Sequence, residues 1–301
     1  MLGPALPTSL EALPRVWRSL DVKVEAELPR SFDVDWSIGG RVRGALGHVL
    51  HDAPDLETPR ARARREKLGL PPAFELIYAQ RFMAPERASP LAHAPARPVL
   101  IAARGEGRRL RVTIRLFGAA MLYQRQIEKA LCRTLEGGIA IAAGARSRAK
   151  LLPTSIVVES PHLESGDLPA DSVRLVFRTP LALLRGERLR ADPEAVLGSL
   201  LSRIAALAAW QGIAVEADPA MLAAELRRLQ CTWQDSGVVD WQRRSAAQLG
   251  RQIPMTGFLG SLLIEGDMEL WRPAIHLAPI THIGSHTTFG MGEVELRRSG
   301  Q

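Results

Sequence analysis

Residues 20–28 (LDVKVEAEL) and 36–51 (WSIGGRVRGALGHVLH) decide the fold class, because a strand pattern is followed closely by a helix pattern. Apolar and polar residues alternate in the first stretch, which is typical of a half-buried β-strand. The second stretch carries apolar residues at helical spacing on one face: Ile38, Val42, Ala45, Leu46 and Val49. We therefore expect a strand and then a helix at the start of the first folded unit.

The rest of the first half also mixes strands and helices. Strands are predicted at 74–82 (FELIYAQRF), 109–117 (RLRVTIRLF) and 151–159 (LLPTSIVVE). A second helix, with Tyr123, Ile127, Ala130 and Leu131 on one face, is expected to end at Gly137 and Gly138. Residues 58–67 (TPRARARREK) have no apolar stripe, so they predict a basic short helix or finger that projects from the core.

The second half repeats this outline. A strand at 172–178 precedes a helix with a leucine-rich stripe, a further helix is predicted over about 219–230, and strands are predicted at 258–265 and 289–296. Residues 160–171 are rich in Ser, Pro, Gly and Asp and predict a linker between modules 1–160 and 161–301. The fold class predicted is α+β, with two tandem ferredoxin-like (RRM-like) modules and a basic helical insertion in the first.

The charge of the chain is carried mainly by arginine. Of 301 residues, 39 are Lys or Arg and 32 are Asp or Glu, and only four of the basic residues are Lys. Arginine suits forked contacts with phosphate, although a GC-rich coding bias would also enrich it. Residues 97–150 hold twelve basic residues against Glu106, Glu128 and Glu136. This uneven distribution favours a nucleic-acid partner, since ordinary surfaces mix the two signs.

Several function classes are excluded or disfavoured. Cys132 and Cys231 lie far apart, which rules out a disulfide framework and a thiolate zinc finger. No run of about 18 apolar residues could span a membrane, and the first residues do not resemble a secretory signal, so we expect a cytoplasmic protein without membrane contact. The His pairs at 48/51 and 282/286 come with no carboxylate at a ligand spacing. We expect neither a metal nor another cofactor.

The helix at 36–51 carries the first candidate site. Arg41, His48 and His51 fall on one polar stripe, and Arg43 lies at the opposite edge. An imidazole titrates near neutrality, so a histidine beside a guanidinium could exchange protons with a bound substrate. An ordinary solvated helix face is the alternative interpretation.

The second candidate is the glycine-rich segment 282–296 (HIGSHTTFGMGEVEL). Glycines allow backbone amides to approach a phosphate closely, and the interleaved hydroxyl and imidazole groups add polar contacts. The alternative is a connection that needs positive φ angles.

The ending HIGSHTTFGMGEVEL resembles the glycine-rich C-terminal loop of the RAMP superfamily, and specifically of the CRISPR-associated endoribonucleases that cut repeat RNA into guide units. Further segments agree in order: RVRGALGHVL, VTIRLFG, GGIAIAAGARSRAKLLPTSIVV, VRLVFRTPLAL, VVDWQRRSAAQ and GFLGSLLIEGD. Together they span most of residues 20–297. The resemblance implies tandem ferredoxin-like modules that bind RNA through basic grooves and loops, without the aromatic platform of ordinary RRM domains.

The resemblance also implies a chemistry. Members of the family cut by metal-independent transesterification, in which a 2′-hydroxyl attacks the scissile phosphate and leaves a 2′,3′-cyclic phosphate. The catalytic residue often lies in or near the first helix of the N-terminal module, which points to Arg41, Arg43, His48 and His51. Because active sites vary within the family, histidine-centred and arginine-centred sites both stay open.

The partners implied are the CRISPR repeat hairpin or its crRNA product and other subunits of the effector complex, with no DNA contacted directly. The RNA-binding candidates come from the basic finger, the middle of the chain, the WQRRS segment and the glycine-rich loop: Arg60, Arg62, Arg64, Arg65, Lys67, Arg146, Arg148, Lys150, Arg243, Arg244, His282, Gly284, Ser285, His286, Gly290 and Gly292. Two alternatives are a non-catalytic RAMP subunit that only binds guide RNA, and a small-molecule enzyme. The second would need an apolar pocket, and the arginine distribution argues against it.

Overall fold

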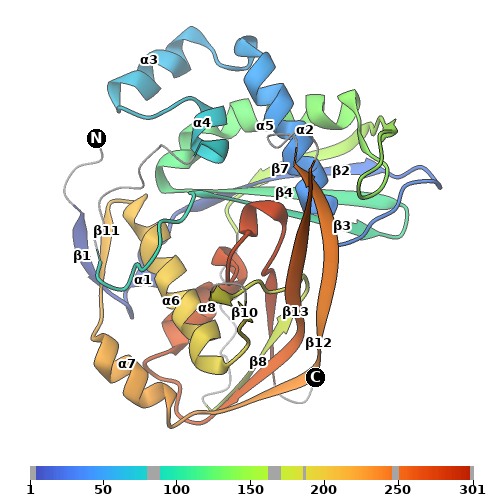
Figure 1. Cartoon of the computed structure of the whole chain (residues 1–301). Coiled ribbons are helices and arrows are strands. Elements are labelled where there is room, and N and C mark those ends of the chain that lie inside the picture. The colour runs from blue at the N-terminus through green and yellow to red at the C-terminus, as the bar shows by residue number, and fades with distance from the viewer. Residues whose placement is uncertain (1–4, 80–88, 162–170, 186–187, 246–250, 299–301) are drawn as a thin grey trace.

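The fold consists of two four-stranded antiparallel sheets, each carrying helices on one face (Figure 1). This computed structural model describes residues 5–79, 89–161, 171–185, 188–245 and 251–298. Both sheets have the same strand order relative to the chain, β3-β4-β2-β7 in the first module and β12-β13-β8-β14 in the second. In each module the strand that comes first in the chain lies between the third and the fourth, as in a ferredoxin-like fold. The predicted tandem architecture is therefore confirmed.

The first module has a strand-helix-strand-strand-helix-strand core. Its elements are β2 (Ser19–Glu27), α2 (Ile38–Asp52), β3 (Val99–Glu106), β4 (Arg109–Phe117), η2 (Gly118–Tyr123), α5 (Gln124–Gly137) and β7 (Pro153–Glu159), with a small hairpin of β5 (Ile139–Ala140) and β6 (Arg148–Ala149) before β7. The predicted stripe of α2 is buried at Ile38, Val42, Ala45 and Leu46 against the sheet and α5. Gly138 ends α5 at φ 101°, as its sequence predicted.

Between α2 and β3 the described residues form three short helices: η1 (Pro54–Leu56), α3 (Pro59–Lys67) and α4 (Ala73–Tyr78). The basic segment 58–67 is a helix with no buried residue. The strand predicted at 74–82 is wrong, because 73–78 is helical and residues 80–82 lie outside the described part. A six-residue apolar run fits both periods, and here Ala73, Leu76 and Ile77 share the buried face of α4.

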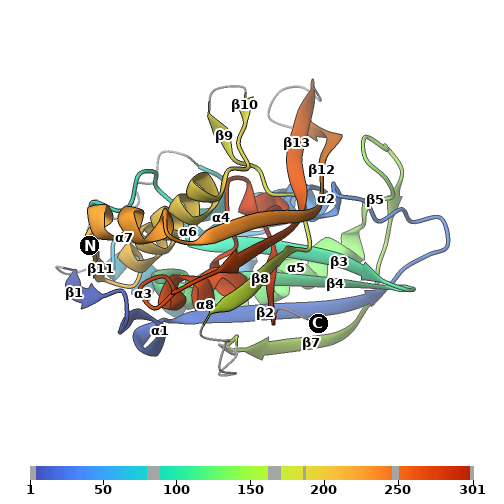
Figure 2. The ribbon, with the colours of Figure 1, turned by 90° about the horizontal axis from the view of Figure 1, so that it is seen from below.

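The second module repeats the core with a longer hairpin. Its elements are β8 (Ser172–Phe177), α6 (Pro193–Ala209), β12 (Gln230–Ser245), β13 (Arg251–Glu265), α8 (Arg272–Thr281), η4 (Thr287–Phe289) and β14 (Val294–Arg297), with β9 (Leu184–Arg185), β10 (Arg188–Leu189), β11 (Ile213–Glu216) and α7 (Pro219–Leu226) as additions. The β12–β13 hairpin extends beyond its sheet towards α2 of the first module (Figures 1 and 2). The strand predicted at 289–296 is wrong for 289–293, which form the end of η4 and a loop.

The N-terminal segment ties the two modules together. Strand β1 (Leu6–Ser9) pairs in parallel with β11 of the second module, and α1 (Leu13–Val16) follows it. Leu13 and Trp17 pack in the core of the second module, whereas Trp210, just after α6, packs in the core of the first. No helix in the described residues has the length and apolar character needed to cross a membrane.

Candidate functional site

Two arginines from different modules each stack on the same aromatic ring. The guanidinium carbons of Arg43 on α2 and Arg243 on β12 lie 4.3 Å and 4.5 Å from the ring centroid of Phe289 on η4. The ring of His286 packs edge-on against the same phenylalanine, with 5.8 Å between the ring centroids. The structure thus brings together three predicted site residues, Arg43, Arg243 and His286, from three distant parts of the sequence.

Helix α4 fixes the position of Arg43. The ring of Tyr78 lies 4.3 Å from the Arg43 guanidinium, and its hydroxyl donates a hydrogen bond to the Arg43 carbonyl. Gly47 makes room for this contact, since a Cβ there would lie 2.9 Å from the Tyr78 ring. Phe74 stacks on the Tyr78 ring, with 5.0 Å between the ring centroids. Arg43 is therefore held in a rigid setting before any substrate arrives.

Neither arginine of this cluster is neutralised by a carboxylate in the described part of the chain. The Nε atoms of Arg43 and Arg243 are buried without a hydrogen-bond acceptor. Burial, aided by Arg97 and Arg243, lowers the pKa of Arg43 to about 10, so this side chain remains a cation at neutral pH. Arg43 Nη2 donates to the Ile77 carbonyl at 3.5 Å, but no carboxylate in the described residues balances either charge. Two half-buried cations of this kind favour an anion, and a phosphate has both the charge and the oxygens for it.

The same cations act on His286. Burial and the nearby Arg243 and Arg43 lower its pKa below the ordinary value of 6.5. The imidazole is therefore neutral at pH 7 and has a nitrogen able to accept a proton. A neutral imidazole that lies near two arginines suits general-base chemistry at a phosphate.

The glycine-rich loop reaches the site through a close backbone contact. A Cβ on Gly39 of α2 would lie 2.5 Å from the Phe289 carbonyl oxygen, so only glycine allows η4 to approach the helix this closely. At Gly292, whose φ is 69°, a Cβ would lie 1.8 Å from the Ile283 carbonyl oxygen. A side chain at either position would clash with the backbone. These two glycines therefore set the position of the loop that carries His286.

The predicted stripe of Arg41, His48 and His51 does not join the cluster around Phe289. Arg41 donates to the carbonyls of Asp33 and Ala140 at 2.5 Å and 2.8 Å, and its side chain is only 6% exposed. His48 is exposed, and His51 is exposed beside Asp52, 2.6 Å from its carboxylate. Arg41 thus fastens α2 to the loop before it and to strand β5, and the structure brings Arg43 rather than this stripe to the glycine-rich loop.

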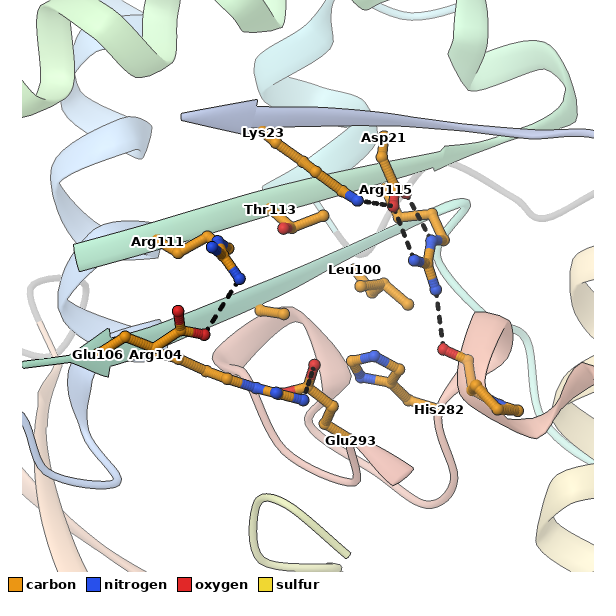
Figure 3. Close-up of a pocket in the computed structure, with 12 residues that line it drawn as sticks. Asp21, Lys23, Leu100, Arg104, Glu106, Arg111, Thr113, Arg115, His282 and Glu293 are labelled. Atoms are coloured by element: carbon orange, nitrogen blue, oxygen red, sulfur yellow. Dashed lines mark hydrogen bonds and ion pairs between the residues drawn. The ribbon is translucent and has the colours of Figure 1, made fainter. Parts of the chain in front are cut away.

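His282 lies inside the interface between the modules (Figure 3). It is 2% exposed, and burial with Arg115, Arg203 and Arg104 lowers its pKa well below the ordinary value. It lines a cavity of about 160 Å³ in which Arg115 pairs with Asp21, and Arg104 with Glu293. Arg115 also donates to the carbonyls of Pro279 and Ile280 at the end of α8. These contacts hold the start of the glycine-rich loop against the first sheet.

The arginines of the basic helix α3 are of two kinds: some pair with a carboxylate, and others line a groove. Arg65 pairs with Glu57 at 2.8 Å and donates to the Leu70 carbonyl, which fixes the helix to the chain on either side. Arg62 lies 3.6 Å from the same carboxylate, and Lys67 is exposed. Arg60 and Arg64 line a groove of about 730 Å³ between α3 and α5. Arg125 and Lys129 of α5 line it too, so the groove is predominantly basic.

The remaining predicted residues lie on two hairpins and on the glycine-rich loop. Arg146, Arg148 and Lys150 are exposed on and beside the β5–β6 hairpin, with no carboxylate partner in the part of the chain described. Arg244 pairs by backbone with Gln252 in the β12–β13 hairpin, but its side chain lies outside the described structure. Ser285 is exposed, and its amide donates to the Ala182 carbonyl. Gly284 and Gly290 take positive φ angles, both 86°.

Sequence reasoning missed Tyr78 and Phe289, the two aromatic residues that organise the site. Tyr78 fell on a segment predicted to be a strand. Phe289 belongs to the glycine-rich segment, in which only glycines, histidines and Ser285 were predicted to bind RNA. The stacking of an arginine on each ring is a tertiary contact, for which the sequence has no local signal. Among the described residues, no three His, Cys, Asp or Glu side chains are grouped as a metal site would require.

Comparison with known proteins identifies related folds. Residues 175–294 match the family model described as CRISPR-associated endoribonuclease Cas6. Two solved Cas6 product complexes match with TM-scores of 0.56 and 0.54, at 17% and 16% identity, and each match covers 93% of this chain and 100% of the other. A Thermus thermophilus Cas6 matches with a TM-score of 0.51 at 15% identity, covering 93% of this chain and 99% of the other. No curated protein matches the sequence. At these identities the solved structures establish the fold.

Proposed function

We propose that this chain is an endoribonuclease that cuts CRISPR repeat RNA into guide units, because its fold matches solved Cas6 structures and its residues 175–294 match the Cas6 family model. The observation that supports the proposal most directly is the cluster of Arg43, Arg243 and His286. It combines a neutral imidazole with two cations that no carboxylate neutralises in the described residues, at the place where the two modules meet. These are the groups that RNA transesterification needs.

In the proposed reaction His286 is the general base. It accepts the proton of the 2′-hydroxyl on the nucleotide upstream of the cut, and that oxygen attacks the adjacent phosphorus. The bond from phosphorus to the 5′-oxygen of the next nucleotide breaks, and this oxygen takes a proton from solvent. The products are a 2′,3′-cyclic phosphate and a new 5′-hydroxyl, and the reaction needs no metal.

The two arginines have a separate role in this proposal. Arg43 and Arg243 would donate hydrogen bonds to the non-bridging oxygens, on which negative charge accumulates as the phosphorane forms. Arg43 is a poor candidate for the base, because even a pKa of about 10 leaves it protonated at neutral pH.

Two basic surfaces supply candidate contacts to the rest of the RNA. The groove between α3 and α5 presents Arg60, Arg64, Arg125 and Lys129, and the β5–β6 hairpin presents Arg146 and Arg148. Such cations bind phosphates without reading the bases, which suits a hairpin stem. We further propose that the product hairpin can remain bound and that the complex then joins other effector subunits.

Incubation of the purified protein with end-labelled repeat RNA in EDTA tests the proposal. The expected result is one cut, with an upstream product that ends in a 2′,3′-cyclic phosphate. A 2′-deoxy substitution at the nucleotide upstream of the cut should abolish cleavage and preserve binding, because only the nucleophile is removed. Binding without any cut would instead identify a non-catalytic guide-RNA-binding subunit, and the absence of both would refute the proposal.

A further inference from the structure

We propose that a slot beside the arginine cluster binds one unpaired RNA nucleobase next to the cut, stacked on Trp36. This inference rests on the function proposed above and adds a subsite to it. The slot has a volume of about 260 Å³ and is lined mainly by the segment before α2, by the end of β3 and by the loop after β8. Its lining includes Trp36, Asp35, Arg104, Arg178 and Gly290.

The indole of Trp36 has the exposure and the freedom that a stacking platform needs. It is 38% exposed and, in the described part of the chain, makes no ring contact or hydrogen bond. Trp210 and Trp271, by contrast, are buried and donate their indole N–H to the carbonyls of Ala96 and Leu222. An exposed indole facing a cavity loses apolar surface to water when a flat ring covers it, and stacking on aromatic side chains is how proteins hold unpaired bases.

The polar groups around the indole suit a base with its sugar-phosphate. Arg104 and Arg178 line the slot, each paired with a glutamate from β14 or just before it, at 2.6 Å and 3.4 Å. Asp35 directs its Oδ1 to Ser37 and Arg41, and its Oδ2 has no hydrogen bond in the described structure. This free oxygen can accept a hydrogen bond from an amino or imino group at the edge of the base.

The slot lies directly beside the proposed site of chemistry. Gly39 and Gly290, whose backbones touch, line it, and Gly290 follows Phe289 in the chain. Arg43 lies one helical turn after Gly39 on the same helix. A nucleotide whose phosphate lies between Arg43 and Arg243 therefore has an adjacent neighbour within reach of Trp36. A base held there would fix the RNA backbone at the scissile bond and add selectivity for an unpaired nucleotide at that position.

Equilibrium binding with modified RNA tests the slot. The probe is fluorescently labelled repeat RNA with a 2′-deoxy nucleotide upstream of the cut, in which each unpaired nucleotide flanking the cut is made abasic in turn. We expect one abasic position to weaken binding to the wild type about tenfold. Trp36→Ala should weaken binding of the intact RNA by a similar factor. In this variant the same abasic change in the RNA should cause no further loss of affinity. Trp36→Phe, which keeps a ring, should retain most of the affinity.

Met221→Ala is the matched control, because Met221 is an exposed apolar residue on α7, away from the slot. The slot is refuted if Trp36→Ala binds as the wild type does, or if every abasic penalty persists undiminished in that variant. It is also refuted if no single abasic position weakens binding to the wild type. If the wild type neither binds nor cuts repeat RNA, the proposed function itself fails; if it cuts normally and only the abasic result is absent, the slot alone fails.

Discussion

At the scale of single residues, the pKa of His286 determines how the protein should respond to pH. Burial together with Arg243 and Arg43 lowers this pKa below 6.5, and the free protein therefore reaches its neutral, base-competent form at a lower pH than an ordinary histidine would. Below that pKa the ring is protonated and cannot accept the 2′-hydroxyl proton, so activity is lost as the pH falls. We expect the cleavage rate at limiting protein, which reports the free enzyme, to rise with pH and to show its inflection below pH 6.5.

The variant Arg243→Gln provides a directional check on this pH profile. Removing one of the two cations should raise the pKa of His286 towards its ordinary value, so the inflection should move to higher pH. Arg227→Ala, an exposed arginine just after α7, should leave the inflection in place. An inflection above pH 7 in the wild type, or one that does not respond to Arg243→Gln, would remove His286 from the proposed role.

At the scale of elements, helix α3 is expected to bind RNA through only part of its arginines. Arg60 and Arg64 line the basic groove and have no carboxylate partner in the described part, whereas Arg65 is committed to Glu57. The double change Arg60→Ala/Arg64→Ala should weaken binding of the repeat hairpin and reduce the slope of log affinity against log salt by about 1 for each phosphate that is no longer bound. The cleavage rate at saturating protein should hold, because the groove is separate from the arginine cluster.

Arg227→Ala/Arg228→Ala is the matched control for the α3 experiment, since it removes the same charge from a surface outside the groove. It should leave the salt slope nearly unchanged. An equal reduction of the slope in both double variants would mean that α3 contributes only to the net charge of the protein.

The elements also show where sequence patterns are sufficient. Strands β2 and β4 and helices α2 and α5 each bury one face, so their periodicity predicted them closely. Helix α4 is six residues long, and the alternation of Phe74, Leu76 and Tyr78 resembles a strand as well as a helix. Helix α8, which was not predicted, contains Pro273 in its first turn and Pro279 inside it, and both residues weaken a helical pattern. Tertiary packing decided these two elements.

At the scale of the whole molecule, Arg115 joins the two modules. Its guanidinium pairs with the fully buried Asp21 of the same sheet at 2.6 Å and donates to two carbonyls at the end of α8 (Figure 3). Arg115→Met would leave the buried Asp21 with Lys23, 3.9 Å away, as its remaining cation, and we expect this to lower the free energy of unfolding by about 3 kcal/mol. The double variant Asp21→Asn/Arg115→Met should lose less, since no unpaired charge remains.

Urea unfolding followed by far-ultraviolet circular dichroism measures this prediction. Arg111→Met is the control: Arg111 lies on the same strand as Arg115, and its loss removes an exposed ion pair with Glu25 of β2, which should cost less than about 1 kcal/mol. A loss of stability in Arg115→Met no larger than in this control would mean that the interface does not depend on the buried pair.

The candidate site forms only where both modules come together. Arg43, Tyr78, Arg243 and Phe289 lie on four elements, α2, α4, β12 and η4, and both modules contribute. The sequence supplied Arg43, Arg243 and His286 as candidates, partly through the resemblance to the family. It did not indicate that Arg43 would join His286 while Arg41 became a structural tie, because that choice depends on which face of α2 meets the glycine-rich loop.

The most direct test of the proposed role of His286 compares the cleavage rates of three histidine variants under single-turnover conditions. With saturating protein and repeat RNA in EDTA, His286→Ala should lower the cleavage rate by about 10²-fold or more and leave RNA binding nearly unchanged. His48→Ala and His51→Ala, which alter exposed residues of α2, should cleave as the wild type does. Normal cleavage by His286→Ala, with a loss in His48→Ala or His51→Ala, would contradict the account and return the active site to the outer stripe of α2.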